Sequence, residues 1–286
     1  MLVVGLTGGI ASGKSTVSKI FSTNHSIPII DADLLAREVI EPGTSGFSLI
    51  VDHFGADRIL DSSGLLDRAA LGEIIFNDPD ERKWLNSVIH PRVRREMVKR
   101  TVSYWLGGEW CVIVDVPLLV EAGMWRWVGD VVVVYVNEKL QLSRLISRPV
   151  PNTPPLTETQ AKARISSQMS LSEKLNYSTY VLDNSGTMKD LEVQIDKLVS
   201  KWKVSQGFNY FGWWYKLCWL VPPVGLTAGL MVLFSRWLKY NVGSKKGRRR
   251  GRGEVDRGWK PEEIELRERN GRPGGRRRTG GSITDE

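Results

Sequence analysis

Eight residues near the start of the chain have the types and spacing of a phosphate-binding loop. Residues 8–15 read Gly-Gly-Ile-Ala-Ser-Gly-Lys-Ser and fit the pattern G-x-x-x-x-G-K-S/T. Glycines let the backbone turn so that several N–H groups point at one anion. Lys14 can then reach the β- and γ-phosphates of a nucleotide, and the Ser15 hydroxyl can bind Mg²⁺. The pattern predicts a nucleoside triphosphate site made of Gly8, Gly9, Ile10, Ala11, Ser12, Gly13, Lys14, Ser15 and Thr16.

The segments on either side of this loop support the prediction. Residues 2–6 read Leu-Val-Val-Gly-Leu, a short apolar run typical of a buried strand in a parallel sheet. Residues 16–21 continue with the spacing of a helix. The glycines are therefore expected between a strand and the N-terminus of a helix, where the helix dipole favours an anion.

Strand and helix patterns alternate along the rest of the chain, which is typical of a parallel sheet covered by helices. The sequence predicts strands at residues 2–6, 27–31, 110–115, 130–136 and 180–183. It predicts helices at 33–41, over most of 45–105, and at 138–148, 157–176 and 187–203. Pro91 is expected in the first turn of a helix that runs to about residue 106. Four prolines in residues 149–155 predict a loop, and the folded body is expected to end near Lys203.

Carboxylates follow two of the predicted strands. Asp31 and Asp33 come after the second strand, and Asp115 ends the third. In open parallel sheets, ligands bind outside the carboxyl ends of the strands. Phosphoryl transfer to an alcohol needs Mg²⁺, positive charge around the γ-phosphate and a carboxylate that accepts the hydroxyl proton. We expect Asp33 to be this base and Asp115 to lie near the Mg²⁺. The alternative for each is a turn or capping aspartate that binds only backbone.

Three arginines lie on the predicted helices around the proline-rich loop. Arg144 and Arg148 precede it, and Arg164 follows it. Two helices that carry arginines after the fourth strand suit a lid over the phosphates, because arginine neutralises phosphoryl oxygens with two parallel hydrogen bonds. The alternative is a solvated helix face with ordinary surface ion pairs.

Several motifs, taken in order, make residues 1–203 resemble the dephospho-coenzyme A kinase family. They are Gly5-Leu6-Thr7 with the glycine loop, Asp31-Ala32-Asp33 with Ala36-Arg37, Ile89-His90-Pro91, Asp115-Val116-Pro117-Leu118-Leu119-Val120-Glu121, Gln141-Leu142-Ser143-Arg144-Leu145, Arg164-Ile165-Ser166-Ser167-Gln168 and Asp183-Asn184-Ser185-Gly186. The chain departs from the family pattern in its longer, proline-rich segment 149–155 and in Tyr177-Ser178-Thr179-Tyr180, where an Ala-Asp pair is expected.

The resemblance implies a P-loop kinase fold, in which helices flank a parallel five-stranded sheet of the α/β class. The kinase domain would comprise a core of residues 1–44, 107–140 and 177–203, acceptor-binding helices at 45–106 and a helical lid at 141–176. The implied activity is ATP-dependent phosphorylation of the 3′-hydroxyl of dephospho-CoA, with Mg²⁺ as cofactor. The implied roles are Asp33 as base, Arg144 as lid arginine on ATP, Asn184 near adenine, and Asp31, Arg37 and His90 near the acceptor. His90 could instead cap the helix that begins at Pro91.

Charge and cysteine content describe the setting of this domain. The net charge of +8 arises in residues 236–286, which hold 16 Lys and Arg against 8 Asp and Glu, so residues 1–235 are balanced. We therefore expect no nucleic acid on the kinase domain. Cys111 and Cys218 are not expected to pair, which suits a reducing compartment. A secretory signal is not expected, because the chain opens with the first strand.

The C-terminal region changes character twice. Residues 204–240 are apolar and aromatic, and 217–238 hold a single charge, Arg236, although Pro222-Pro223 interrupts them. With basic residues on both flanks, we expect residues 207–238 to contact a membrane and to tether the kinase to the cytosolic face of an intracellular membrane. A hairpin or interfacial anchor, a bent span and an apolar segment packed on protein all remain open. Residues 241–286 are expected to be a disordered basic tail that binds anionic lipid or RNA, serves as a nuclear-import signal, or has no partner.

Three other functions are alternatives to this prediction. A different nucleoside or nucleotide kinase would share the same core. A GTPase-like switch lacks support, because the chain has no Asn-Lys-x-Asp signature. A catalytically inactive scaffold is opposed by the joint presence of Lys14, Ser15, Asp33 and Arg144. The sequence leaves the oligomeric state open.

Overall fold

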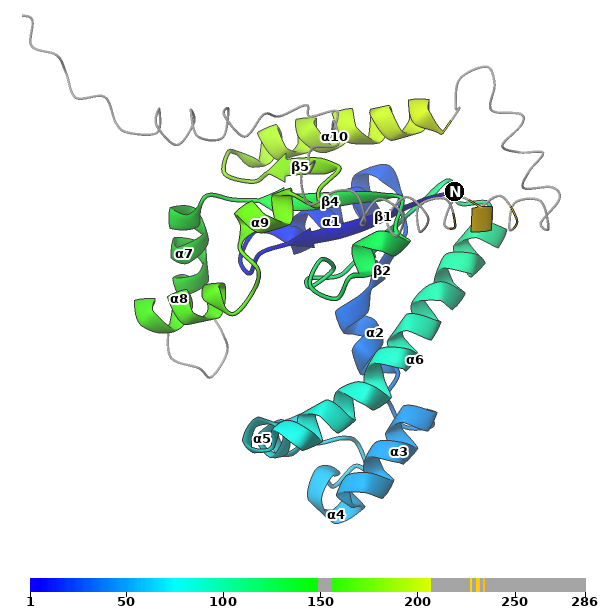
Figure 1. The fold of residues 1–286 in the computed structure, drawn as a ribbon, viewed down its shortest axis with the longest axis vertical. Helices are drawn as coiled ribbons and strands as arrows, with labels where there is room; N and C mark the ends of the chain where they lie inside the picture. The colour runs from blue at the N-terminus through cyan, green and yellow to red at the C-terminus, as the bar shows by residue number, and fades with distance from the viewer. Residues whose placement is uncertain (149–155, 207–226, 228–229, 232–233, 235–286) are drawn as a thin grey trace, which may run out of the picture. The chain divides into compact units, whose positions relative to one another are not determined.

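The computed structural model describes residues 1–148 and 156–206, together with Thr227, Leu230, Met231 and Phe234. In these residues a five-stranded sheet has the order β2-β3-β1-β4-β5, and every neighbouring pair is parallel (Figure 1). The strands are β1 (Leu2–Gly8), β2 (Ile29–Asp31), β3 (Cys111–Asp115), β4 (Asp130–Tyr135) and β5 (Tyr180–Asp183). The predicted α/β fold with a parallel five-stranded sheet is confirmed.

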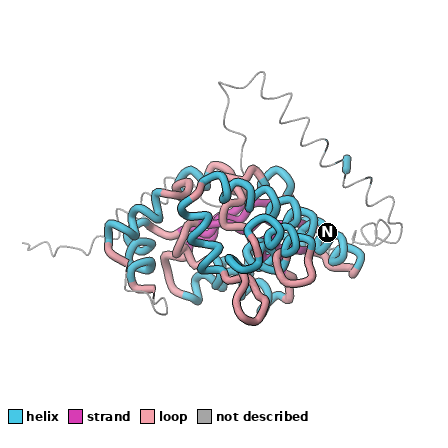
Figure 2. The backbone as a smooth tube through the Cα atoms, turned by 90° about the horizontal axis from the view of Figure 1, so that it is seen from below, coloured by secondary structure: helices cyan, strands magenta, loops and turns pink. Residues whose placement is uncertain are grey.

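Helices pack on both faces of this sheet, and Figure 2 shows the strands in magenta among the helices in cyan. The helices of the described residues are α1 (Lys14–His25), α2 (Ala32–Glu38), α3 (Ser45–Phe54), α4 (Ala56–Ile59), α5 (Arg68–Asn77), α6 (Pro79–Leu106), the 3-10 turn η1 (Met124–Trp127), α7 (Glu138–Ile146), α8 (Glu158–Ser166), α9 (Leu171–Leu175) and α10 (Met188–Ser205).

The alternation of side chains along the strands decides which helix covers which face. Val4 and Ile113 face one cluster, which α1 and α10 complete. Val112 and Val133 face the opposite cluster, to which α2, α6 and α9 contribute. Successive residues of a strand point to opposite faces, so strands that are apolar at almost every position can bury both. This explains why these strands read as continuous apolar runs rather than as alternating ones.

Two helix predictions were wrong. Residues 157–176 form two helices, α8 and α9, because Ser170 caps α9: its hydroxyl accepts the N–H of Glu173, whose carboxylate accepts the N–H of Ser170. A helix does not begin at Pro91. The helix α6 starts at Pro79, behind the capping side chain of Asp78, and continues through Pro91.

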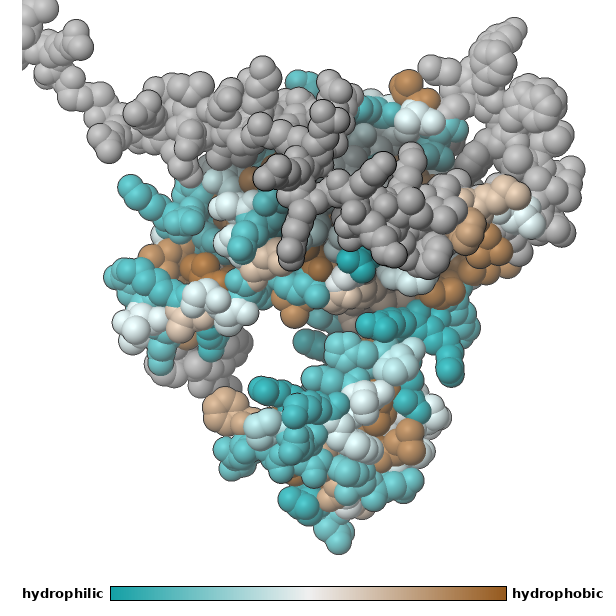
Figure 3. All heavy atoms as spheres, in the orientation of Figure 1, coloured by the Kyte–Doolittle hydropathy of each residue, from teal (hydrophilic) through white to brown (hydrophobic). Residues whose placement is uncertain are grey.

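The interior position of Pro91 is explained by packing on either side of it. Leu85 and Val88 pack with α3, α4 and α5, whereas Met97 packs on the sheet. These contacts offset the helical hydrogen bond that a proline cannot donate. His90 therefore lies inside a helix and is not its cap. In Figure 1, α6 runs from beside the sheet to the α3–α5 cluster, and Figure 3 shows an open cleft, rimmed largely by hydrophilic side chains, between α3–α5 and the helices α7 and α8.

Most of the C-terminal predictions concern residues that the structure does not describe. The loop at 149–155 and the tail at 241–286 lie outside the described residues, as does all of 207–238 except residues 227, 230, 231 and 234. In the part of the chain that is described, no helix is both long enough and apolar enough to cross a bilayer. The division of the kinase domain into core, insertion and lid stays a prediction.

Trp202 is the largest of the five buried side chains through which α10 packs on the domain. Trp202 is buried, stacks on Phe21 of α1 with ring centroids 5.7 Å apart, and lies 6.2 Å from the ring of Tyr180 in β5. We expect Trp202→Ala to lower the free energy of unfolding by about 3–5 kcal/mol, because it opens a large cavity. Val204→Ala, at an exposed position of the same helix, should change it by less than about 0.5 kcal/mol. Chemical denaturation of both variants measures this, and equal losses would contradict the packing role of Trp202.

Candidate active site

The predicted glycine loop connects the end of β1 to the start of α1. β1 ends at Gly8, and α1 begins at Lys14 after Gly13, which has a φ of 86° in the left-handed region. No side chain caps this helix. The N–H groups of a first helical turn have no partner within the helix, so here they can bind an anion, with the helix dipole in support. The strand–loop–helix order expected from the sequence is confirmed.

Side chains from distant segments hold the carbonyl oxygens of this loop. Asn184, directly after β5, donates its Nδ2 to the Ser12 carbonyl at 2.8 Å. A Cβ on Gly13 would lie 2.1 Å from that Nδ2, so the close approach needs glycine as well as the positive φ. Asn184 was expected near adenine. The structure shows its side chain bound to the loop backbone, and its role toward a nucleotide stays a prediction.

Two glutamines fix the loop to the helices of the expected lid. Gln141 of α7 is buried and donates Nε2 to the carbonyl of Ile10 at 2.8 Å, and Gln168 accepts the N–H of Ile10 at 3.2 Å. Neither contact could be predicted from the sequence, because the backbone groups that these side chains bind lie in a distant segment of the chain. Arg144 lies three residues after Gln141 on α7 and so on the same face of that helix.

Lys14 and Asp115 form an ion pair beside the loop. The Nζ of Lys14 donates to Oδ1 of Asp115, which ends β3 and is buried. Burial raises the pKa of Asp115 above its usual value, the charge of Lys14 opposes this rise, and the nearby charge of Asp31 adds to it. The lysine expected on the phosphates is therefore paired with a buried carboxylate in this structure.

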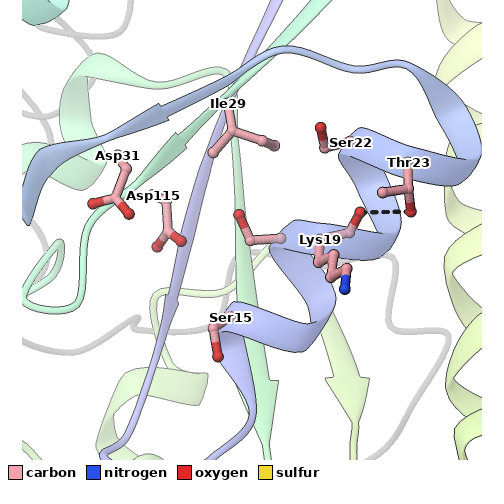
Figure 4. A pocket seen from close by; sticks show the side chains of 8 residues that line it. Ser15, Lys19, Ser22, Thr23, Ile29, Asp31 and Asp115 are labelled. Carbon is pink, nitrogen blue, oxygen red and sulfur yellow. Dashed lines mark hydrogen bonds between the residues drawn. The ribbon is translucent and has the colours of Figure 1, made fainter. Parts of the chain in front are cut away.

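The two strand-end carboxylates line one pocket of about 300 Å³ with Ser15 (Figure 4). Figure 4 shows the side chains of Asp31 and Asp115 next to each other, with Ser15 at the start of α1. The described residues hold no cluster of three or more His, Cys, Asp or Glu that would bind a metal alone. Mg²⁺ in nucleotide sites, however, takes one or two protein oxygens and completes its shell with phosphates and water. Ser15, Asp31 and Asp115 fit that requirement.

The structure separates the roles of the two aspartates after β2. Asp31 caps α2, since its Oδ1 accepts the N–H of Asp33 at 2.8 Å and that of Leu34 at 3.1 Å. Asp31 was expected near the acceptor, and that role stays a prediction. Asp33 lies in the first turn of α2 with an exposed side chain, and Arg37 lies exposed in its last turn.

The third expected acceptor residue, His90, is exposed on α6. α2 packs along α6, where Arg100 pairs with Glu38 and with Glu96. Asp33 and Arg37 therefore lie on one helix, α2, which packs beside the helix that carries His90. No hydrogen bond or ion pair joins these three side chains.

The raised pKa of Asp115 predicts a pH effect on stability. Above the usual value of 3.8 the folded state holds the Asp115 proton more tightly than the unfolded state, so stability falls as the pH rises through that range. Asp115→Asn cannot ionise, and we expect it to unfold at the same or a higher temperature than the natural chain at neutral pH. Thermal unfolding at a series of pH values measures this. The difference should shrink as the pH falls toward 3.8, and a clearly less stable variant at neutral pH would contradict the account.

Comparisons with known proteins agree with this geometry. The family model described as "Dephospho-CoA kinase" matches residues 2–190. A dephospho-CoA kinase from Oceanobacillus iheyensis is 44% identical over 204 residues, which is 71% of this chain and 99% of that protein. The solved structure of a dephospho-CoA kinase from Campylobacter jejuni is 27% identical, with a TM-score of 0.56, and the match covers 72% of this chain and 98% of that one.

The match to one relative extends beyond residues 1–206. A dephospho-CoA kinase from Saccharomyces cerevisiae is 39% identical over 252 residues, which is 86% of this chain and 98% of that protein. Residues 1–206 make up less than 86% of the chain, so the match must include part of the C-terminal region. From the family match and these relatives, we conclude that the chain belongs to the dephospho-CoA kinase family.

Proposed function

We propose that this chain transfers the γ-phosphoryl group of ATP to the 3′-hydroxyl of dephospho-CoA and so forms CoA, the last step of CoA biosynthesis. The observation that carries the proposal is the uncapped start of α1, which carries Lys14 and has Asp31 and Asp115 beside it at the carboxyl ends of β2 and β3. Family membership supports the choice of acceptor.

Binding of the nucleotide would change the partner of Lys14. The loop amides and the first turn of α1 bind the phosphates, and Lys14 leaves Asp115 for the β- and γ-phosphate oxygens. Ser15, Asp31 and Asp115 would be the residues that hold Mg²⁺. The ion, when bound, neutralises charge on the phosphates. Lys14 would thus have two alternative partners, the Asp115 carboxylate and the phosphate oxygens.

Asp33 is proposed as the general base. The capping bonds of Asp31 fix the first turn of α2 and leave the carboxylate of Asp33 exposed and unpaired with the helix backbone. The acceptor is proposed to enter the cleft of Figure 3, along α2 and α6, where Arg37 and His90 can contact it. In that position Asp33 can accept the proton of the attacking 3′-hydroxyl.

Positive charge on the far side of the phosphates is proposed to come from α7. Gln141 holds α7 to the loop at Ile10, and Arg144 lies one turn further along the same face. An arginine in that place can bind two phosphoryl oxygens as charge develops on them. Residues 141–176 would in this way act as the lid and residues 45–106 as the acceptor-binding insertion.

Removal of the base tests this function. Asp33→Asn in the full chain should lower kcat for dephospho-CoA phosphorylation by roughly a hundredfold or more, the scale of general-base loss. The KM for ATP should stay within about twofold, because Asp33 is not part of the phosphate loop. Asp196→Asn, at an exposed position of α10, is the matched control and should leave both constants unchanged. A kcat for the Asp33 variant close to that of the control would show that another group takes the proton.

We further propose that residues 207–238 contact a membrane and keep the kinase on its cytosolic face. Support comes from the apolar and aromatic sequence between basic flanks, and from Leu230, Met231 and Phe234, whose apolar side chains are exposed.

Flotation with liposomes that contain anionic lipid should recover the full chain with the vesicles and leave a chain ended after Gln206 behind. If both chains float, the membrane contact lies in the kinase body rather than in residues 207–238. Flotation of neither would favour packing of this segment on protein.

A further inference from the structure

A lysine outside the predicted site is buried directly behind the phosphate loop. The side chain of Lys174, on α9, is fully buried, with an exposed fraction of 0%. Its Nζ lies 3.3 Å from the carbonyl oxygen of Gly8, 3.1 Å from that of Pro117 and 2.9 Å from Oε1 of Glu121. An ammonium group has three N–H donors, and each finds an oxygen here. This set of partners offsets the large cost of taking the charge out of water.

The two carbonyl partners belong to the two segments that carry the phosphate chemistry. Gly8 ends β1, where the loop that leads to Lys14 begins. Pro117 follows Asp115 by two residues, and its carbonyl also accepts the hydroxyl of Thr7 at 2.8 Å. Lys174 therefore links the start of the Lys14 loop to the segment that follows Asp115.

The third partner extends this link to the expected lid. Glu121 also accepts the N–H of Met169 at 3.3 Å, and the residue before Met169 is Gln168, which holds the N–H of Ile10. A core position alone would not select this residue type, because an apolar side chain of similar length packs at lower cost than a buried charge. The position needs a cation that bonds to carbonyl oxygens.

We propose that Lys174 is a positioning residue for phosphoryl transfer. It holds the Gly8 carbonyl and the Pro117 carbonyl at a fixed separation, so that the loop amides face the nucleotide and Lys14 can move between Asp115 and the phosphates. The effect of Lys174 on turnover rests on the proposed kinase function, whereas its effect on nucleotide binding can be measured without the acceptor.

The test compares Lys174→Met with Lys197→Met in the full chain. Lys197 is an exposed lysine on α10, outside the phosphate loop, the lid and the acceptor-binding helices, so its loss should change nothing. For Lys174→Met we expect the Kd of a non-hydrolysable ATP analogue and the KM for ATP to rise together by about tenfold or more, the scale of one lost charged hydrogen bond. The KM for dephospho-CoA should stay within about twofold.

A purely structural role for Lys174 would give a different result. It would lower the folded fraction, and so the apparent kcat, while both KM values and the analogue Kd of the folded fraction stayed unchanged. Unchanged nucleotide binding in well-folded Lys174→Met would overturn the proposal. If the natural chain binds the analogue but does not phosphorylate dephospho-CoA, the kinase proposal fails, and the binding comparison still decides the role of Lys174.

Glu121→Gln covers the case in which Lys174→Met does not fold. The side chain of Glu121 is 24% exposed and glutamine has the same size, so the substitution should leave the fold intact while it removes the negative partner of Lys174 and weakens the bond to Met169. We expect a rise of about threefold or more in the analogue Kd, consistent with loss of about one hydrogen bond's net contribution. No rise in the Kd of this variant would overturn the proposal.

Discussion

The first turn of α1 has backbone N–H groups with no capping side chain, and the rest of the active site is arranged around them. β1 is the central strand, so these donors lie in the middle of the carboxyl edge of the sheet. The strand order places β3 and β2, with Asp115 and Asp31, on one side, and β4, followed by α7 and its Arg144, on the other. A phosphate chain bound at α1 would thus have carboxylates for a metal ion on one flank and an arginine helix on the other.

The N–H groups at the start of α1 that would bind a ligand cannot also hold the shape of the loop, so other bonds must do this. In this chain, side chains from three later segments hold carbonyl oxygens of the loop: Asn184 holds Ser12, Gln141 holds Ile10 and Lys174 holds Gly8. Each of these contacts joins residues more than a hundred positions apart in sequence. The shape of the phosphate site therefore depends on complete folding of the domain through β5, and the packing of α10 by Trp202 is part of the same requirement.

The sequence predicted the fold and the loop well, because both depend on local patterns. Apolar runs located all five strands, and the spacing of glycines around Lys14 located the loop. Two kinds of feature escaped prediction. Pro91 was expected to start a helix, but packing of the two halves of α6 outweighed the local preference of proline. Lys174 and Gln141 read as ordinary helix residues, because the carbonyl oxygens that they bind come from distant segments. The roles of Asp33, Arg37, His90 and Arg144 stay predictions.

The identity of the phosphorylated atom tests the central claim most directly. The full chain would be incubated with ATP, Mg²⁺ and dephospho-CoA, and the product examined by phosphorus NMR with proton coupling. The account predicts one ADP per product molecule and a new phosphomonoester coupled to the ribose 3′ proton, with no ATP consumed when the acceptor is left out. ATP hydrolysis that does not depend on the acceptor, or a phosphate on any other oxygen, would contradict it.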